Sequence, residues 1–281
     1  MNNERVTIYI PDKQIKMGMG IWKEMFRELI KSRELTWRLF LRDFNARYKQ
    51  TILGILWVLI LPIVAVGIFV ILNKGGILNV GAIDVPYPVF ALFGITIWTL
   101  FASGLSSASN SMVQAGSMIV KINFSKVSLV VSSIGQPIVE FLVRIGLLVL
   151  VFIIFKTIPH WETIFLPLVL LPLFLLTLGI GFILALSSGV LRDVPNVVVL
   201  ATTILMFISP VFYPIPEAGI FAELSYWNPL AHFITAARDI VFKGYISNQP
   251  GFIWSAIFAA LVFFASWKVF YIAETKIPER I

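Results

Sequence analysis

Two charged side chains, Glu140 and Arg144, interrupt a long apolar stretch of the sequence and are four residues apart. On a helix this spacing places both side chains on one face, where they can pair. A lone charge at mid-bilayer costs roughly 2.5–3.5 kcal/mol on insertion scales, so we expect the two to pair and to face protein. The pair could fix the orientation of its helix, contact a substrate or, through Glu140, carry a proton.

Beyond this pair, the sequence offers few groups for catalysis or metal binding. Cysteine is absent and the two histidines, His160 and His232, are far apart, which excludes thiolate chemistry and disfavours a histidine metal site. No GxxxxGK[ST], HExxH or nucleophile-elbow motif occurs, so the chain has no P-loop of its own. We therefore expect no catalytic residue, no metal site and no cofactor bound by this chain.

Two other function classes would each need particular residues. An ion-coupled secondary transporter would use Glu140 as its proton carrier. A membrane-embedded glycosyl- or acyltransferase would need carboxylates or a histidine near the headgroups, and the candidates are Asp193, Glu217, Glu223 and the pair His232–Asp239. His232 and Asp239 are seven residues apart, a loose alignment on a helix, so we interpret His232 as an interfacial residue.

Aromatic residues make up 14% of the chain, and many fall in the second and fifth apolar stretches. Aromatic rings bind the C–H faces of sugars without needing charge, and Tyr and Trp add hydrogen-bonding groups. A lipid-facing aromatic belt and ordinary packing explain most of them. As candidates for a ring-lined substrate conduit we single out Phe93, Trp98, Phe101, Phe207, Phe212, Tyr213, Tyr226 and Trp227.

The composition identifies the class of protein that must position these groups. The 281 residues are 58% hydrophobic and only 13% charged, which is too apolar for a soluble domain. The net charge of +7 does not indicate nucleic acid, because half of the 22 Lys and Arg precede residue 50. Residues 1–16 are polar and do not resemble a cleavable signal peptide. The sequence predicts an all-α polytopic membrane protein.

The first fifty residues form a cytoplasmic leader, 1–50, ahead of a membrane domain, 51–281. Ile21, Trp22, Met25 and Phe26 recur at helical spacing, opposite charged faces. This pattern predicts an amphipathic helix in the membrane interface, with Trp22 and Phe26 toward the acyl chains. The alternative is that the helix packs on the protein's own core.

Six membrane spans follow by hydropathy, and an even number places both termini on the same side. The expected spans are 52–72, 87–108, 127–155, 163–188, 197–214 and 251–272. With this topology one side carries 17 Lys and Arg and the other 4. The positive-inside rule then makes both termini cytoplasmic.

The segment after the fifth span breaks the pattern of simple crossings. Pro210, Pro214 and Pro216 prevent a straight helix from continuing. The following residues are too polar for a full span, and irregular backbone at membrane depth requires protein or a water-filled cavity around it. We predict a re-entrant helical hairpin over residues 211–243 at the outer mouth.

Four segments together resemble the permeases of polysaccharide-exporting ABC transporters. No single segment is specific, but their order, their spacing and the six-span layout agree over nearly the whole chain. The segments are RDFNARYKQTILGILWVLILP (Arg42–Pro62), LRDVPN (Leu191–Asn196), SPVFYP (Ser209–Pro214) and NPLAHFITAARD (Asn228–Asp239).

The resemblance implies a two-fold homodimer in the bacterial cytoplasmic (inner) membrane, paired with two copies of a separate ABC ATPase that binds ATP and magnesium. The implied substrate is an undecaprenyl-linked glycan, with O-antigen first and teichoic acid or capsule as alternatives. Membrane lipid is the other partner, and nucleic acid is not one. Charged residues on the cytoplasmic side would then contact the ATPase and transmit its conformational change to the membrane domain. The candidates are Glu24, Arg27, Lys121, Lys126, Arg192 and Asp193.

Overall fold

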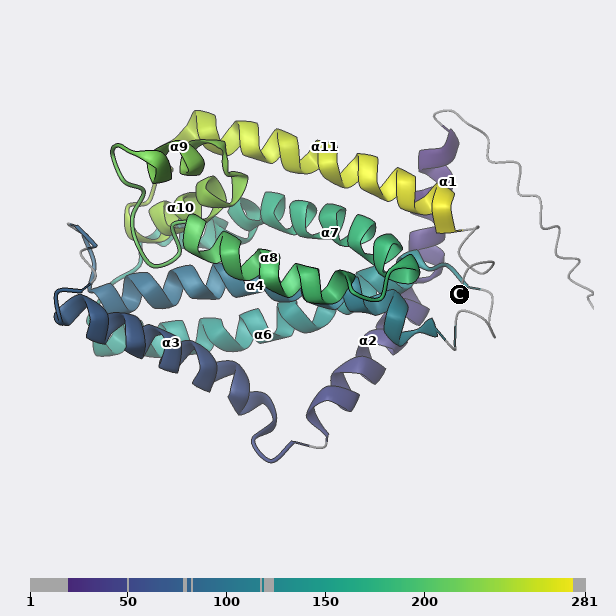
Figure 1. Cartoon of the computed structure of the whole chain (residues 1–281), viewed down its shortest axis with the longest axis horizontal. Helices are drawn as coiled ribbons and strands as arrows, with labels where there is room; N and C mark the ends of the chain where they lie inside the picture. The colour runs from purple at the N-terminus through teal and green to yellow at the C-terminus, as the bar shows by residue number, and fades with distance from the viewer. Residues whose placement is uncertain are drawn as a thin grey trace, which may run out of the picture.

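The computed structural model describes residues 20–49, 51–77, 80–81, 83–116, 118 and 124–274, and within these ranges it contains helices and no strand. Long helices lie side by side in a bundle, while α1 (Gly20–Lys31) and α2 (Arg33–Tyr48) run across one end of it (Figure 1). The short helices α9 (Ile220–Trp227) and α10 (Pro229–Phe242) lie at the opposite end. We call these the α1–α2 end and the α9–α10 end.

Five long apolar helical stretches in the described chain are able to cross a membrane. Their main helices are α3 (Trp57–Lys74), α4 (Tyr87–Gln114), α6 (Val127–Ile154), α7 (Leu166–Val190) and α11 (Gln249–Ala273). The short 3₁₀ helices η1 (Gly54–Leu56) and η2 (Trp161–Phe165) precede α3 and α7. These five helices overlap five of the six expected spans, and the protein is a multi-pass membrane protein.

The remaining expected span, 197–214, corresponds to the shorter helix α8 (Val194–Ile208). Its 15 residues extend about 22 Å, less than the ~30 Å of a hydrocarbon core. Pro195 stands in its first turn and Pro210 follows its end, so prolines limit the helix on both sides. The helix nevertheless runs along the bundle from the α1–α2 end toward the α9–α10 end (Figure 1).

Helix α4 is the centre of the bundle and packs against α3, α6, α7 and α8. Of its most apolar window 78% is buried, compared with 17% for the stretch Gly54–Lys74 that contains α3. Small residues allow this close packing, since a Cβ on Gly104 would contact Thr177 of α7 and one on Gly181 would contact Ala108. A central helix that is covered on most sides can carry polar residues, as α4 does in its last turns.

Helix α1 is amphipathic, as predicted, but its apolar face packs on the protein. Ile21 and Met25 are buried at 2% and 1% exposure. The Trp22 ring lies 5.6 Å from that of Phe264 on α11, and the Phe26 ring lies 4.9 Å from that of Trp267. These contacts agree with the alternative given above, that the helix packs on the protein's own core, because α11 extends far enough to meet both rings, although Phe26 stays 47% exposed.

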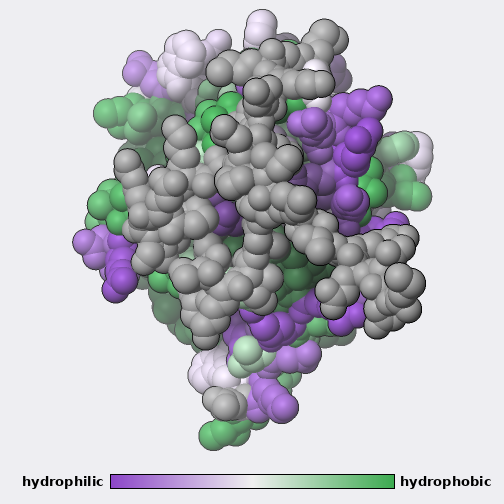
Figure 2. Space-filling model, turned by 90° about the vertical axis from the view of Figure 1, so that its right-hand side faces the viewer, coloured by the Kyte–Doolittle hydropathy of each residue, from purple (hydrophilic) through white to green (hydrophobic). Residues whose placement is uncertain are grey.

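Viewed from the α1–α2 end, hydrophilic side chains are prominent on the visible surface, with hydrophobic patches between and around them (Figure 2). Helix α2 packs along α6, and the Phe40 ring covers Gly135, where an added Cβ would clash with it. The first nineteen residues of the expected leader and residue 50 lie outside the described ranges.

Candidate functional site

The α9–α10 end is held together by one buried arginine on α10. Arg238 is 6% exposed, and its Nη1 donates a hydrogen bond to the Pro210 carbonyl at 2.6 Å. Its Nη2 donates to the Val211 carbonyl and, at 3.4 Å, to the Phe90 carbonyl of α4. The guanidinium carbon also lies 3.6 Å from the centroid of the Phe90 ring, a cation–π contact. One side chain thus joins α4, α10 and the turn that follows α8.

A second connection joins the same turn to the start of α10. Asn228 caps this helix by accepting a hydrogen bond from the Leu230 amide at 3.0 Å. The Asn228 side-chain amide donates to Ser209 Oγ at 2.9 Å. Two of the segments that carry the resemblance, Ser209–Pro214 and Asn228–Asp239, therefore meet in space and bind each other.

His232 and Asp239 do not form an acid–base pair. His232 Nε2 lies 2.9 Å from the Tyr226 carbonyl. Asp239 pairs with Lys243 at 3.0 Å and accepts a hydrogen bond from the Ser247 amide at 3.0 Å. Both residues thus stabilise the ends of α9 and α10.

The aromatic residues proposed for a conduit divide into two groups. Phe93, Trp98, Phe101 and Phe212 are only 2–3% exposed and belong to the core of the chain. Phe212 stacks on Phe69 of α3 at 3.8 Å between ring centroids. In this structure the four rings fill the interior of one chain, so their role in lining a conduit stays a prediction.

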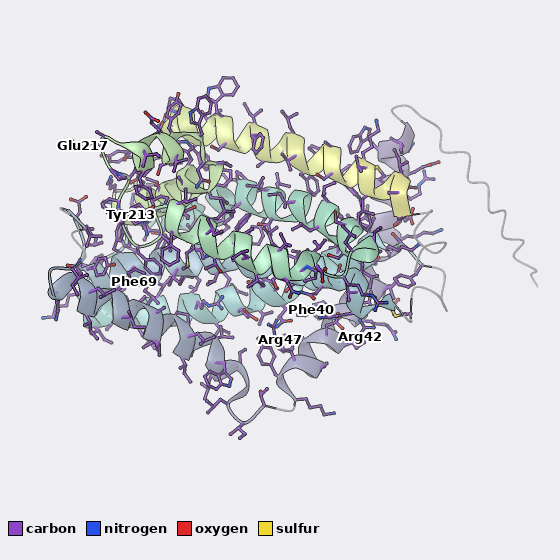
Figure 3. The ribbon with its side chains drawn as sticks, in the orientation of Figure 1. Phe40, Arg42, Arg47, Phe69, Tyr213 and Glu217 are labelled. Carbon is purple, nitrogen blue, oxygen red and sulfur yellow. The ribbon has the colours of Figure 1, made fainter. Side chains whose placement is uncertain are left out.

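The second group lies on the surface of α8 and α9. Phe207, Tyr226 and Trp227 are 54%, 67% and 81% exposed. Tyr213, which is half-buried beside them, donates its hydroxyl to the Phe207 carbonyl at 2.6 Å. Figure 3 labels Tyr213 and Phe69 in this part of the structure. The exposed rings are the only members of the predicted set that this conformation leaves accessible to a ligand.

A polar cluster forms around Glu140, where the end of α2 meets α6. Arg144 Nη2 lies 3.3 Å from Glu140 Oε2, so the two charges are paired as the spacing predicted. Glu140 Oε1 also accepts hydrogen bonds from the Tyr48 hydroxyl and from Gln136 Nε2, both at 3.1 Å. Arg47 approaches the same oxygen at 3.7 Å. Burial, and then the nearby Glu140 charge, raise the pKa of Tyr48, which therefore remains a donor.

The contribution of α2 to this cluster was not predicted from the sequence. The Tyr48 hydroxyl connects the leader to the third expected span, 127–155, through its hydrogen bond to Glu140. A possible signal was the tyrosine itself, since a buried Tyr hydroxyl usually finds a hydrogen-bond partner.

The six charges proposed for coupling lie in different environments. Arg27 on α1 and the turn residues Arg192 and Asp193 are exposed, and Glu24 is half-buried. Lys121 lies outside the described residues. Lys126 is only 8% exposed, and its Nζ donates to the Glu274 carbonyl at 2.9 Å, so its charge is turned inward in this structure. The chain folds it inward because α11 ends beside the start of α6.

Comparison with known proteins places the chain in a family. The family model described as "ABC-2 type transporter" matches residues 34–242. The chain therefore belongs to the ABC-2 type transporter family, whose members are membrane subunits that work with an ABC ATPase partner. Within the described residues no group of three or more His, Cys, Asp or Glu could hold a metal ion.

Individual relatives cover most of the chain. It is 23% identical to the O-antigen export system permease protein RfbA of Myxococcus xanthus, over 92% of this chain and 99% of the relative. It is 28% identical to the polysialic acid transport protein KpsM of Escherichia coli, over 84% of this chain and 92% of the relative. A Klebsiella pneumoniae RfbA is 26% identical, over 74% of this chain and 80% of the relative.

Proposed function

We propose that the chain is the membrane-spanning subunit of an ABC exporter that moves lipid-linked polysaccharide across the bacterial cytoplasmic membrane. The observation that carries this proposal is the near full-length similarity to permeases named for O-antigen export and polysialic acid transport. The substrate we favour is an undecaprenyl-linked O-antigen. Capsule or teichoic acid is the alternative within the same class.

The proposed topology has six crossings, with α8 as the fifth and α9–α10 as a re-entrant hairpin at the outer face. Helices α7 and α11 run in the same direction along the bundle, so the chain must return between them, and α8 is the helix that does so (Figure 1). The distribution of Lys and Arg supports cytoplasmic termini. The α1–α2 end would then be cytoplasmic.

The working unit would be a two-fold homodimer bound to two ATPase copies, which hold ATP and magnesium. The exposed turn at Arg192 and Asp193 joins α7 to α8 and is reachable by a soluble partner. Arg27 and Glu24 on α1 lie at the same end of the bundle. These four residues remain the proposed coupling sites, together with Lys121, which lies outside the described residues.

The exposed aromatic residues at the outer end form the part of the conduit proposal that we retain. Alanine at Phe207, Tyr226 and Trp227 should reduce surface glycan by about 10-fold without lowering the melting temperature, since exposed substitutions usually change stability by less than ~0.5 kcal/mol. Alanine at Phe221, another exposed ring on α9, is the matched control. Unchanged export in the triple variant would remove the conduit from the proposal.

The experiment that tests the function is purification of the tagged chain from native membranes, with mass spectrometry of proteins and lipids that accompany it. Stoichiometric recovery of a P-loop ATPase together with an undecaprenyl-linked glycan is the expected result. Recovery of the chain alone, from membranes that contain its partners, would instead favour a secondary transporter. For that class, Glu140→Gln would abolish activity, whereas an ATP-driven exporter would retain it in molecules that fold.

A further inference from the structure

A polar cavity of about 440 Å³ lies between α2, α4 and α6, on the side of the bundle where the leader helix meets the spans. Phe40, Arg42 and Arg47, all labelled in Figure 3, contribute to its wall from α2. The volume is within the range of about 300–1,000 Å³ that is usual for small-molecule sites. None of the roles assigned so far uses this space.

Two guanidinium groups face the cavity and give it a net positive lining. Arg42 Nε pairs with Asp43 Oδ1 at 2.8 Å, and the contact of Arg47 with Glu140 is longer, at 3.7 Å. The side chains of Arg42 and Arg47 are 48% and 58% exposed, so the cavity opens to the surface and both groups have donors left for a ligand. The planar guanidinium fork matches the oxygens of a phosphate group.

The remaining walls offer neutral hydrogen-bonding groups from α4 and α6. Ser111 and Ser133 donate to the Ala108 and Val130 carbonyls of their own helices at 2.7 Å each, which leaves their hydroxyl oxygens as acceptors toward the cavity. Asn110 and Gln136 add side-chain amides, and the Phe40 ring adds an apolar face. Such a mixture of acceptors, amides and one ring suits a sugar.

The depth of the cavity fits the lipid headgroup region. Helix α4 has 28 residues and is about 42 Å long, so it exceeds a ~30 Å hydrocarbon core by ~12 Å. The polar lining of α4, Ser106–Gln114, occupies its last turns. The neighbouring surfaces of α2 and α6 expose apolar side chains, including Leu41 at 38% and Ile138 at 37%. A lipid tail can therefore remain in the membrane while its headgroup enters the cavity.

Resting on the function proposed above, we infer that this cavity binds the phosphate-bearing headgroup of the lipid carrier, with Arg42 and Arg47 as phosphate ligands and the α4–α6 wall against the first sugar. The site is complete within one chain. It selects the carrier lipid before the glycan moves, because the phosphate charge is common to substrates whose sugars differ.

The test measures binding of farnesyl diphosphate to the full chain in lipid nanodiscs, with farnesol and inorganic pyrophosphate as comparison probes. Arg42→Gln and Arg47→Gln should each weaken farnesyl diphosphate binding by about 10-fold or more, as expected when one charge-assisted hydrogen bond is lost. Arg38→Gln is the matched control, since Arg38 lies on the same helix but is exposed and pairs with Glu34. Melting temperatures of all variants establish that they are folded.

Each outcome decides the inference. Weak binding of both farnesol and pyrophosphate, with tight binding of farnesyl diphosphate, supports a lipid headgroup site. Pyrophosphate binding as tight as farnesyl diphosphate binding would identify a soluble phosphate ligand and overturn the lipid assignment. Equal effects of Arg38→Gln and Arg47→Gln, or no binding to the wild type, would overturn the site itself. Export and ATPase recovery are measured separately, so a chain that exports glycan without binding the probe contradicts this inference alone.

Discussion

The two ends of the bundle are fastened by different chemistry. At the α9–α10 end, Arg238 donates to the main-chain carbonyls of Pro210, Val211 and Phe90, none of which titrates. Toward the α1–α2 end the connections use titratable groups, namely Tyr48 and Arg144 on Glu140, and Lys126 beside Glu274. The contacts of Arg238 are therefore a fixed anchor, although Asp239 and Lys243 form an ion pair at the same end. The connections at Glu140 and Glu274, by contrast, are ones that a proton or a partner can alter.

This difference agrees with the roles proposed for the two ends, namely coupling to the ATPase at the α1–α2 end and contact with the glycan at the α9–α10 end. A segment that must receive movement from an ATPase benefits from connections with more than one stable arrangement. An outer end that must keep its shape is better stabilised by hydrogen bonds to backbone carbonyls, because a main-chain carbonyl does not change its protonation state. Substitutions at each end separately test this difference.

Arg238→Met should have the largest effect, since it removes the hydrogen bonds that Arg238 donates to the Pro210, Val211 and Phe90 carbonyls while keeping much of the side-chain volume. Leaving buried carbonyls without a donor costs about 1–3 kcal/mol each, so the variant should lose roughly 3–5 kcal/mol and give a lower yield and a lower melting temperature than the wild type. Size-exclusion chromatography and thermal unfolding measure this. Arg38→Met, at an exposed site, should behave like the wild type. Normal yield and stability of Arg238→Met would mean that the anchor is not needed.

Glu140→Gln should destabilise the other end by about 3 kcal/mol, because it leaves Arg144 buried without its counter-charge. Within the described chain Arg144 Nε and Nη1 already lack a hydrogen-bond partner. The double variant Glu140→Gln/Arg144→Gln should recover part of the loss, since no unpaired charge remains. A double-mutant cycle on melting temperatures measures the coupling. Additive losses would show that the ion pair does not join the two residues energetically.

Gly94→Ala should cost about 2 kcal/mol, since the added methyl group overlaps the Val211 carbonyl and the Arg238 guanidinium. If the two ends are independent, this cost should depend on Arg238 and not on Glu140. Combined with Arg238→Met, the glycine substitution should cost less than it does alone, because only the overlap with the Val211 carbonyl remains. Combined with Glu140→Gln, its cost should be additive. Gly67→Ala is a control on α3, because nothing lies within 4 Å of its added Cβ. Thermal unfolding of the combinations is the measurement.

The sequence predicted the apolar helices and the amphipathic leader because hydropathy and helical spacing are local properties. It also predicted the Glu140–Arg144 contact, since four residues on one helix fix the distance. It did not predict the role of Arg238, which was counted only among the four Lys and Arg of the outer side, because its partners are carbonyls up to 148 residues away. The burial of Trp98 and Phe101 was missed for a related reason. Periodicity alone does not reveal which of several apolar helices is central.

Prolines explain the remaining difference between expectation and structure. The fifth span was predicted to run to Pro214, but α8 ends at Ile208, and Tyr213 folds back to the Phe207 carbonyl. Pro210 was correctly interpreted as a break. The compensation for that break, an arginine and an asparagine from α10, depends on tertiary contacts that single-sequence patterns do not contain.

Glu274→Gln should give the smallest effect, and one that depends on pH. Burial, and then the nearby Glu28 charge, raise the pKa of Glu274 from 4.5 to about 7, although Lys126 acts in the opposite direction. The folded state therefore holds a proton that the unfolded state releases, so stability falls as pH rises from about 4.5 through about 7. Between pH 6 and 8 this group should cost the wild type about 1 kcal/mol.

Glutamine can still accept the hydrogen bond that the Lys126 amide donates to Glu274 Oε2, at 3.1 Å. The Glu274→Gln variant should therefore match the wild type near pH 5 and exceed its melting temperature at pH 8. Glu223→Gln, on the exposed surface of α9, should leave the pH profile unchanged. If the melting temperatures of Glu274→Gln and the wild type changed with pH in parallel, Glu274 would not be the source of the pH dependence. If Arg238→Met changed the slope as well, the two ends would not differ in the way their chemistry indicates.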